Sequence, residues 1–430
     1  MTLAPVSGEV FTELARTRPT PAGTAALRAG LHARRLLLLK SLLVRVEQRS
    51  SLLPPVVRQS FKKDWAWLEQ AERADAAAVR DVVDYPMTGA WLAQALAAPE
   101  GPAFERHLAH LGCVAVAAAV RAGHRLDGTL MLPAGALNLP GLGVLRCPSG
   151  SAHLSGSARL IRITDGAGHG GVELSSPVVW SGPGASRPVG GGPGWSALRR
   201  LPGTTVVLDD LDPYRVSPHG IGPAALPAVE RPYSAYRFWV QRWREARELL
   251  STTHPGRAAE TMAVLRAVVP LAPSQRAGGT AMSATLRAAP GAFLAQLPAD
   301  ASELAESLVH ESHHNKLAAL HELVPLYRSG GGALHHVGWR SDPRPIPGVF
   351  QGVYAHLALT DLWRRAGNGP ATPERWRRRA VEQFESYRDR IGQALSILLE
   401  SDELTFAGRE FAREMGRHHT SLGVAARIRG

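Results

Sequence analysis

The sequence predicts an α+β protein, and three observations carry this prediction. Apolar residues recur at helical intervals through the first 125 residues. Short β-prone runs separated by glycine and proline fill residues 126–225. Helical patterns return from residue 226 to the end of the 430-residue chain. We therefore expect a helical N-terminal region over 1–125, a β-rich region over 126–225 and a mostly helical region over 226–430.

The helical N-terminal region opens with a leucine stripe at helical spacing. Its members are Leu27, Leu31, Leu36, Leu39, Leu42 and Leu43. A tryptophan-rich helical stretch follows over 61–98, with breaks at LLPPVV before it and at DYPMTG within it. A further apolar helix is expected over 104–121.

The β-rich region contains six runs that we expect to form strands: TLMLP, GVLRC, SAHLSG, ARLIRIT, GVELSSPVVW and TTVVLDD. Residues 166–171 match GxGxxG, but a strand follows them where a dinucleotide-binding fold needs a helix. We interpret these glycines as a hairpin turn. The last run ends at Asp209, Asp210 and Asp212, which could hold a cation or a basic substrate group, although a solvated turn with aspartate capping is favoured.

In the third region we expect an amphipathic helix over 233–250, an Ala-rich helix over about 257–269, and two strands over 280–287 and 291–297. A long helix follows. Asp300 and Glu303 resemble a capping box at its start, and Pro325 marks its end. Two charged helices in the C-terminal part are expected to act as structural cover.

The long helix contains the pattern HExxH at residues 310–314. His310 and His314 lie one turn apart on the same helix face, so both imidazoles can reach one metal ion while Glu311 lies beside it. A surface helix with clustered histidines is the alternative interpretation. The pattern predicts that residues 226–430 form a metal-binding catalytic region.

Two histidines need at least one more protein ligand to hold a first-row metal. His321 lies seven residues beyond His314, about 10 Å along the axis, so it cannot bind the same ion unless the helix breaks. His356 is the favoured third ligand, because Gly352 one turn earlier would admit a close approach. Asp342, in an arginine-flanked loop, is the alternative. The third-ligand pattern of metzincin proteases is absent from the sequence after residue 314.

The formal net charge is +12, carried by 45 Arg and only four Lys. These basic residues are dispersed and accompany no recognisable nucleic-acid-binding module, so we expect no nucleic-acid partner. An acidic peptide or a small carboxylate ligand fits the charge better. Two cysteines, the lack of a basic start followed by an apolar core, and the absence of long apolar runs predict a reduced, cytoplasmic protein that does not bind membranes.

The segment HESHHNKLAALHELVPL, followed by VGWRSDPRPIPGVFQGVYAHLAL, resembles the HExxH-type peptide-modification proteins of bacterial gene clusters for ribosomally made peptides. The shared features are HExxH followed by Lys-Leu, the WRxDPRP loop and QGxYA with the apolar helix after it. DDLDPYR and the Arg-Arg-Leu-Leu-Leu-Leu stretch near residue 34 are similar to family sequence as well.

This resemblance implies an iron(II)- and 2-oxoglutarate-dependent oxygenase that hydroxylates the β-carbon of a residue in a ribosomally synthesised precursor peptide. His310 and His314 would bind the iron, with His356 as the inferred third ligand. Glu311 would orient a metal-bound water or hold a ligand histidine. In some relatives the module is fused to a radical enzyme, so a radical peptide-modifying enzyme of the same pathway is a further expected partner.

The 2-oxoglutarate co-substrate has a distal carboxylate that needs a cation, ideally a bidentate arginine. Arg340 and Arg344 are the best placed in the sequence, and Lys316, two residues beyond a ligand, is their competitor. Ordinary loop anchoring is the alternative role for the two arginines.

Two other functions compete with the oxygenase. HExxH is also the signature of zinc metallopeptidases, in which Glu311 would be the general base and zinc the metal. The third possibility is a non-catalytic accessory protein that binds peptide and has lost its metal site. Failure to bind any divalent metal would favour that last function.

Overall fold

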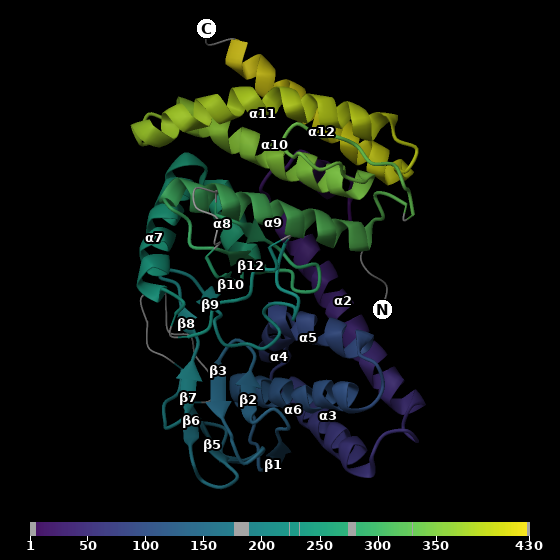
Figure 1. The fold of residues 1–430 in the computed structure, drawn as a ribbon, viewed down its shortest axis with the longest axis vertical. Helices are drawn as coiled ribbons and strands as arrows, with labels where there is room; N and C mark the ends of the chain where they lie inside the picture. Colours follow the sequence, from purple (N-terminus) through teal and green to yellow (C-terminus); the bar gives the residue numbers. More distant parts are fainter. Residues whose placement is uncertain are drawn as a thin grey trace.

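The computed structural model describes residues 6–175, 189–222, 224–231, 233–273, 281–328 and 330–427, and it confirms the α+β prediction (Figure 1). The helices are α1 (Gly8–Ala15), α2 (Pro21–Gln48), α3 (Pro55–Ala74), α4 (Ala76–Val83), α5 (Pro86–Ala97), α6 (Pro102–Ala122), α7 (Tyr236–Thr253), α8 (Pro255–Val264), α9 (Ala301–Leu323), α10 (Ile346–Asn368), α11 (Glu374–Glu400) and α12 (Phe406–Arg427). The strands are β1 (Gly128–Met131), β2 (Ala136–Leu139), β3 (Gly143–Arg146), β4 (Ser151–Gly156), β5 (Leu160–Asp165), β6 (Gly171–Ser175), β7 (Trp195–Ala197), β8 (Arg199–Arg200), β9 (Val207–Leu208), β10 (Ala267–Pro270), β11 (Ser283–Ala284) and β12 (Ala292–Ala295).

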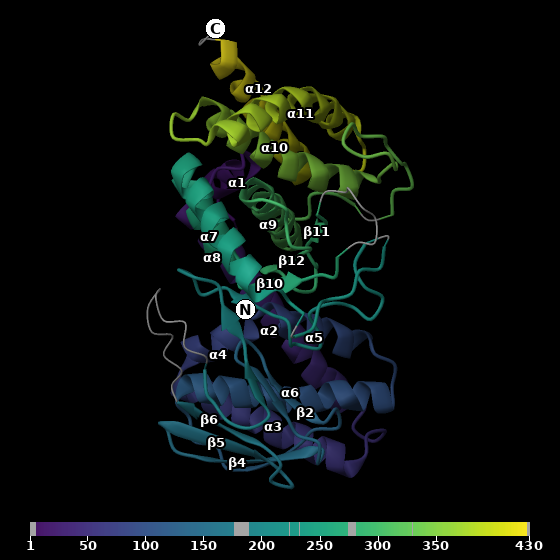
Figure 2. The same cartoon turned by 60° about the vertical axis from the view of Figure 1, so that its left-hand side comes forward.

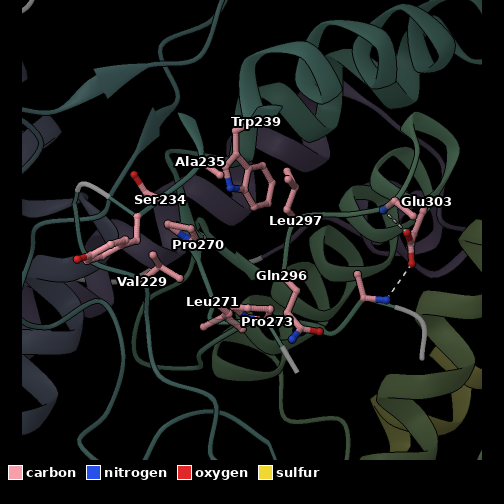
Figure 3. Close-up of a pocket in the computed structure, with 13 residues that line it drawn as sticks. Val229, Ser234, Ala235, Trp239, Pro270, Leu271, Pro273, Gln296, Leu297 and Glu303 are labelled. Atoms are coloured by element: carbon pink, nitrogen blue, oxygen red, sulfur yellow. Dashed lines mark hydrogen bonds between the residues drawn. The ribbon is translucent and has the colours of Figure 1, made fainter. Parts of the chain in front are cut away.

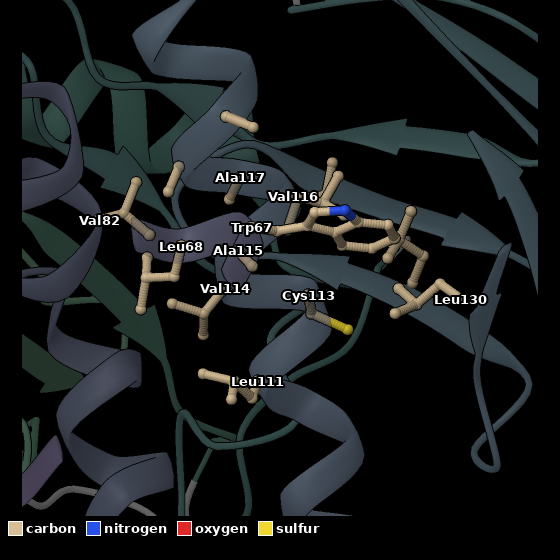
Figure 4. Close-up of a cluster of buried hydrophobic side chains, with 14 of the residues drawn as sticks. Trp67, Leu68, Val82, Leu111, Cys113, Val114, Ala115, Val116, Ala117 and Leu130 are labelled. Carbon is tan, nitrogen blue, oxygen red and sulfur yellow. The ribbon is translucent and has the colours of Figure 1, made fainter. Parts of the chain in front are cut away.

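The N-terminal helices and the first strands share one hydrophobic core. Helix α6 lies at its centre, because every residue from His110 to Val120 is buried. Trp67 of α3, Val82 of α4 and Leu130 of β1 surround this helix (Figure 4). The predicted apolar helix is confirmed, and it is a buried axis on which both helices and strands pack.

The strands form three sheets. Two are antiparallel, with the orders β1-β4-β5-β6 and β2-β3-β7. The hairpin turn predicted from the glycine motif is confirmed, since residues 166–170 join β5 to β6. The run GVELSSPVVW forms a strand as far as Ser175, and its remainder lies outside the described residues.

The third sheet has the order β11-β12-β10-β9-β8. It lies between an N-terminal half, which contains α3–α6 and β1–β7, and a second half, which contains α7–α12 (Figure 1). Strands β9, β10 and β12 are parallel to one another. The two edge strands, β8 and β11, run antiparallel to their neighbours. Helix α9 follows β12 directly, so this sheet determines where the HExxH helix begins.

The prediction that the Ala-rich helix continues to about residue 269 is wrong. Helix α8 ends at Val264, and Ala267–Pro270 form the central strand β10. All four residues of this strand are buried, as expected for a parallel strand covered on both faces. Periodicity alone cannot distinguish such a short continuous apolar run from a buried helix segment.

Helix α9 lies between α7 and α10, and α11 covers α10 on the outer side (Figure 2). Helix α2 connects this half to the N-terminal half, because Leu27 belongs to the core around α10 whereas Leu42 belongs to the core around α6. Gly30 permits the close approach of α2 to α9. A Cβ atom at Gly30 would come within 2.5 Å of the Leu323 side chain.

The helices of the described ranges include none that combines the length and the apolar character needed to cross a membrane.

Candidate metal centre

The predicted HExxH helix is confirmed as α9, which ends two residues before the proline expected to stop it. Asp300 is its N-cap, and the Asp300 carboxylate accepts a hydrogen bond from the backbone N–H of Glu303. The Glu303 carboxylate does not complete a capping box. It accepts instead from the backbone N–H groups of Ala281 and Ala299, which fixes the segment before β11 against the start of α9.

His310 and His314 face each other on α9, as the spacing predicts, with their Nε2 atoms 3.0 Å apart. The Nδ1 atom of His314 lies 3.0 Å from Oε1 of Gln351 on α10. Because an amide oxygen only accepts hydrogen bonds, Nδ1 of His314 carries the proton and Nε2 presents a lone pair. That lone pair faces His310, so the space between the rings requires a proton or a cation.

His356 brings a third imidazole to this pair from α10. Its ring centroid lies 4.9 Å from that of His310. The Nδ1–H of His356 donates to the carbonyl oxygen of Gly352 at 2.8 Å, which leaves Nε2 as the lone-pair nitrogen. The structure therefore brings together the three histidines selected from the sequence.

Two aromatic rings hold His356 in place. Trp339 contacts one side, with ring centroids 4.7 Å apart, and Tyr387 of α11 stacks on the imidazole at 4.9 Å with an interplanar angle of 18°. Gly352 makes room for Trp339, because a Cβ atom there would lie 2.9 Å from the indole. The close approach that this glycine permits is that of the tryptophan ring.

The surroundings of His310 and His356 favour the neutral imidazole, which is the form that binds metals. Burial lowers the pKa of His310 well below its usual value, and the charges of His314 and His356 act in the same direction. Burial also lowers the pKa of His356 to about 4, with contributions from His314 and Arg390.

Glu311 is buried beside the histidines, and its carboxylate is engaged. The Ser283 hydroxyl of β11 donates to it at 2.8 Å, and Thr285 supplies a second hydrogen bond. Burial raises the pKa of Glu311 despite these bonds. The carboxylate therefore links α9 to the edge strand β11.

These side chains form a cluster of imidazoles and not a finished ligand sphere. Over the described ranges, no three His, Cys, Asp or Glu side chains are already arranged to hold a metal ion. The donor types nevertheless fit a first-row metal, since three imidazoles from two packed helices meet at one place. Asp342, the alternative third ligand, lies on the surface and pairs with two arginines.

The cations predicted for the co-substrate occupy different environments. The Lys316 ammonium is buried and donates to Glu260 at 2.6 Å, on a face of α9 turned away from His314. Arg340 and Arg344 are partly exposed and both pair with Asp342. None of these three cations contacts the histidine cluster.

Arg390 of α11 is a cation that the sequence analysis missed. Its stem passes Gly338, where a Cβ atom would lie 2.8 Å from Cγ of Arg390, and its guanidinium lies 5.2 Å from the centroid of Tyr387. It acts on the pKa of His356, as described above. Across the described residues it makes no hydrogen bond or ion pair, so its donors are available to an anion.

A cavity of about 440 Å³ lies at the carboxyl ends of β10 and β12, between the start of α7 and the start of α9 (Figure 3). Trp239, Leu271 and Leu297 give it an apolar wall, and Gln296 and Glu303 line its other side. Ligands commonly bind at the carboxyl ends of parallel strands. The cavity reaches Ala281, two residues before the serine that binds Glu311, so β11 connects it to the imidazole cluster.

The acidic turn at Asp209 is buried, and the prediction of a solvated turn is wrong. The aspartate capping is confirmed, because Asp209 accepts from the backbone N–H groups of Leu211 and Asp212. The Tyr85 hydroxyl donates to the other oxygen of Asp209. Asp210 is held by a set of three polar side chains, namely Arg199, Arg231 and Ser234.

His321 has a structural role, as expected from its spacing. Its Nδ1 accepts from the backbone N–H of Leu326, and its ring stacks on Tyr327 with centroids 4.0 Å apart. Tyr387 and Arg390 carried no local sequence signal, and they reach the cluster only because α11 packs on α10, which in turn packs on α9. Gln351 belongs to the QGxYA motif, but its bond to His314 depends on the packing of α10 on α9.

Comparison with protein-family models and with curated proteins finds no match for this chain.

Proposed function

We propose that this chain is an iron(II)- and 2-oxoglutarate-dependent oxygenase that hydroxylates the β-carbon of a residue in a ribosomally synthesised peptide. The observation that carries the proposal is the gathering of the partly buried His310 and His314 with the buried His356 while Glu311 is bonded to Ser283. This combination supplies metal ligands without a free carboxylate base.

The engagement of Glu311 favours an oxygenase over a zinc peptidase. A peptidase of the HExxH type needs this carboxylate to take a proton from water. Here the carboxylate already accepts from Ser283 and Thr285 on the neighbouring strand segment. Its role in our proposal is to hold α9 in register with β11 and thereby keep the histidines in place.

Iron with 2-oxoglutarate would supply the oxidising chemistry: one oxygen molecule converts 2-oxoglutarate to succinate and carbon dioxide and replaces a C–H hydrogen of the peptide by hydroxyl. The protein itself has to bind the co-substrate and the peptide, orient them, and exclude water. Gln351 and the Gly352 carbonyl fix the rings of His314 and His356 with Nε2 free. Trp339 and Tyr387 cover His356 with apolar surface.

Arg390 is the cation that best suits the distal carboxylate of the co-substrate. It is the guanidinium that acts on His356, and it makes no hydrogen bond or ion pair within the described part of the chain. Arg340 and Arg344 both form ion pairs with Asp342, and Lys316 forms one with Glu260. A bidentate arginine contact to a carboxylate is stronger and more directional than a lysine contact.

The cavity in Figure 3 is the proposed site for a side chain of the peptide. Its apolar wall and its volume of about 440 Å³ suit a bulky apolar residue. Ala281 at the cavity lies two residues before Ser283, the β11 residue that binds Glu311, and two residues of extended chain span about 7 Å. A peptide seated in the cavity would therefore have a neighbouring residue near the histidines.

The decisive experiment is anaerobic. The purified protein is loaded with Fe(II), 2-oxoglutarate is added, and the visible spectrum is searched for the weak charge-transfer band of a keto-acid chelated to iron(II). We expect the band in the unmodified protein and its loss in His314→Ala. Absence of the band together with tight zinc binding would favour a metallopeptidase, and absence of any metal binding would favour the accessory protein.

A further inference from the structure

A second cavity, of about 470 Å³, lies in the N-terminal half between α3, α6 and the end of β1. Its lining is mostly apolar, with Val57 and Phe61 from α3, Leu108 and Ala109 from α6, and Met131 from β1. Figure 4 shows the adjoining core, in which Trp67 and Leu68 of α3 and Leu130 of β1 lie around the buried side chains of α6. The imidazole cluster belongs to the other half of the molecule, so this cavity is separate from the proposed active site.

Asp64 is the exceptional residue of this cavity. It belongs to α3, is 2% exposed, and lines the cavity among apolar neighbours. Its Oδ1 atom is buried without a hydrogen-bond partner in the described residues. Lys63 lies 3.6 Å from this oxygen, beyond hydrogen-bond distance, and its ammonium donates instead to the carbonyl oxygen of Thr129 and lies over the Trp67 ring.

A glycine on α6 leaves space for the carboxyl group of Asp64. Gly112 of α6 faces it, and a Cβ atom on that glycine would come within 2.9 Å of Oδ2 of Asp64. Burial raises the pKa of Asp64 to about 6, although the charge of Lys63 opposes this shift. Oδ1 of Asp64 therefore has the Lys63 ion pair at 3.6 Å but no hydrogen bond, and a ligand that donates a hydrogen bond to this oxygen would offset part of the cost of burying the carboxylate.

We propose that this cavity binds a small protonated amine with an apolar body, whose ammonium group donates to Asp64 while the body fills the space between α3 and α6. Glu105 and Arg106 at the rim carry opposite charges, so the buried carboxylate is the group that selects a cation. The proposal does not depend on the chemistry at the histidine cluster. A lysine side chain of a peptide carries the same chemistry, and the experiment separates the two sources.

The test is calorimetric titration of the full-length protein at pH 7.5 with phenethylamine and with its neutral counterpart 2-phenylethanol. We expect the amine to bind at least about tenfold more tightly than the alcohol, since a hydrogen bond to a charged group contributes about 1.5–3 kcal/mol. Asp64→Asn should remove this preference. Glu105→Gln, the same chemical change at the rim, should keep it.

Two further measurements keep the test informative if Asp64→Asn fails to fold. In the unmodified protein, amine affinity should fall as the pH is lowered through about 6, because Asp64 then becomes protonated. The other titratable groups around Asp64 are Lys63 on its own helix and Glu105, Arg106 and Cys113 on α6. Ala109→Trp should block both ligands by filling the cavity.

Some results of these titrations would overturn the proposal, and others would identify the source of the ammonium group. Equal affinity for amine and alcohol, retention of the preference in Asp64→Asn, its loss in Glu105→Gln, or no binding of any amine would each overturn the proposal. N-acetyl-lysine N-methylamide is titrated in parallel. Tighter binding of this compound identifies a peptide lysine as the source of the ammonium, and tighter binding of phenethylamine identifies a free amine.

Discussion

The Nδ1 atom of His314 lies 3.0 Å from Oε1 of Gln351, and this hydrogen bond joins the HExxH helix to α10. It fixes both the tautomer and the orientation of a proposed metal ligand. Gln351→Leu should therefore weaken Fe(II) or Co(II) binding by about 10–100-fold without altering the helical content. Metal titration followed by circular dichroism checks this. Gln241→Leu on the surface of α7 is the matched control, and an unchanged metal affinity in Gln351→Leu would contradict the role given to this bond.

Each of the three imidazoles should be necessary for tight metal binding. His310→Ala and His314→Ala are expected to abolish it, and His356→Ala should do the same because its ring centroid lies 4.9 Å from that of His310. Metal content after dialysis is the measurement. His321→Ala, on the same helix but stacked on Tyr327, should retain the metal. Stoichiometric metal in His356→Ala would show that another residue completes the ligand set.

Arg257 should contribute strongly to stability. Its side chain is fully buried, donates to the carbonyl oxygen of Thr17 and to Nε2 of His313, and contacts Glu260. Arg257→Met removes one of the two cations paired with the buried Glu260, together with the donors to Thr17 and His313, and we expect a loss of about 3–5 kcal/mol of unfolding free energy. Urea unfolding measures the loss. The exposed Arg237→Met on α7 serves as control and should change stability by no more than about 0.5 kcal/mol.

Asp212 should make the protein less stable as the pH rises. Burial and the neighbouring Asp209 raise the pKa of Asp212 above its usual value of about 4. The folded state then retains a proton that the unfolded state releases, so this group favours unfolding as the pH increases above that value. The stability of Asp212→Asn relative to the unmodified protein should therefore increase from pH 5 to pH 9.

Thermal unfolding at the two pH values measures this difference, and titrating groups that do not contact Asp212 cancel between the two proteins. Asp209 does not cancel, because its charge and that of Asp212 act on each other. Asp81→Asn, a half-exposed aspartate on α4, is the control and should show no such divergence. A stability difference between Asp212→Asn and the unmodified protein that does not grow with pH would contradict the assignment of the raised pKa.

Local sequence signals predicted the HExxH helix and the choice of His356. The cap at Asp300, the apolar spacing and a terminating proline all act within a few residues, so they could be recognised without the fold. The partner of Glu311 could not be recognised in this way, because Ser283 lies on another element and becomes a neighbour only when α9 packs against β11. The same holds for Tyr387 and Arg390, which were predicted to lie in mere structural cover.

Two predictions did not anticipate how side chains are placed: the direction in which Lys316 points from α9, and the burial of Asp209 and Asp212. Lys316 is close to His314 in sequence, but residues two apart do not share a helix face, and the lysine points to Glu260 on α8. Asp209 and Asp212 were expected at a solvated turn because aspartate favours such turns. They are buried because Tyr85 and backbone N–H groups supply the hydrogen bonds that water would otherwise provide.

Helix α2, which belongs to two cores, has a consequence for gene fusion and truncation. A fragment that begins at residue 226 would lose Leu27 from the core around α10 and the Thr17 carbonyl that accepts from Arg257. The histidine-bearing half therefore does not contain all the contacts that stabilise it. Recombination that transfers it to another protein would have to carry the first two helices along, and selection on either half of the molecule constrains the sequence of the other.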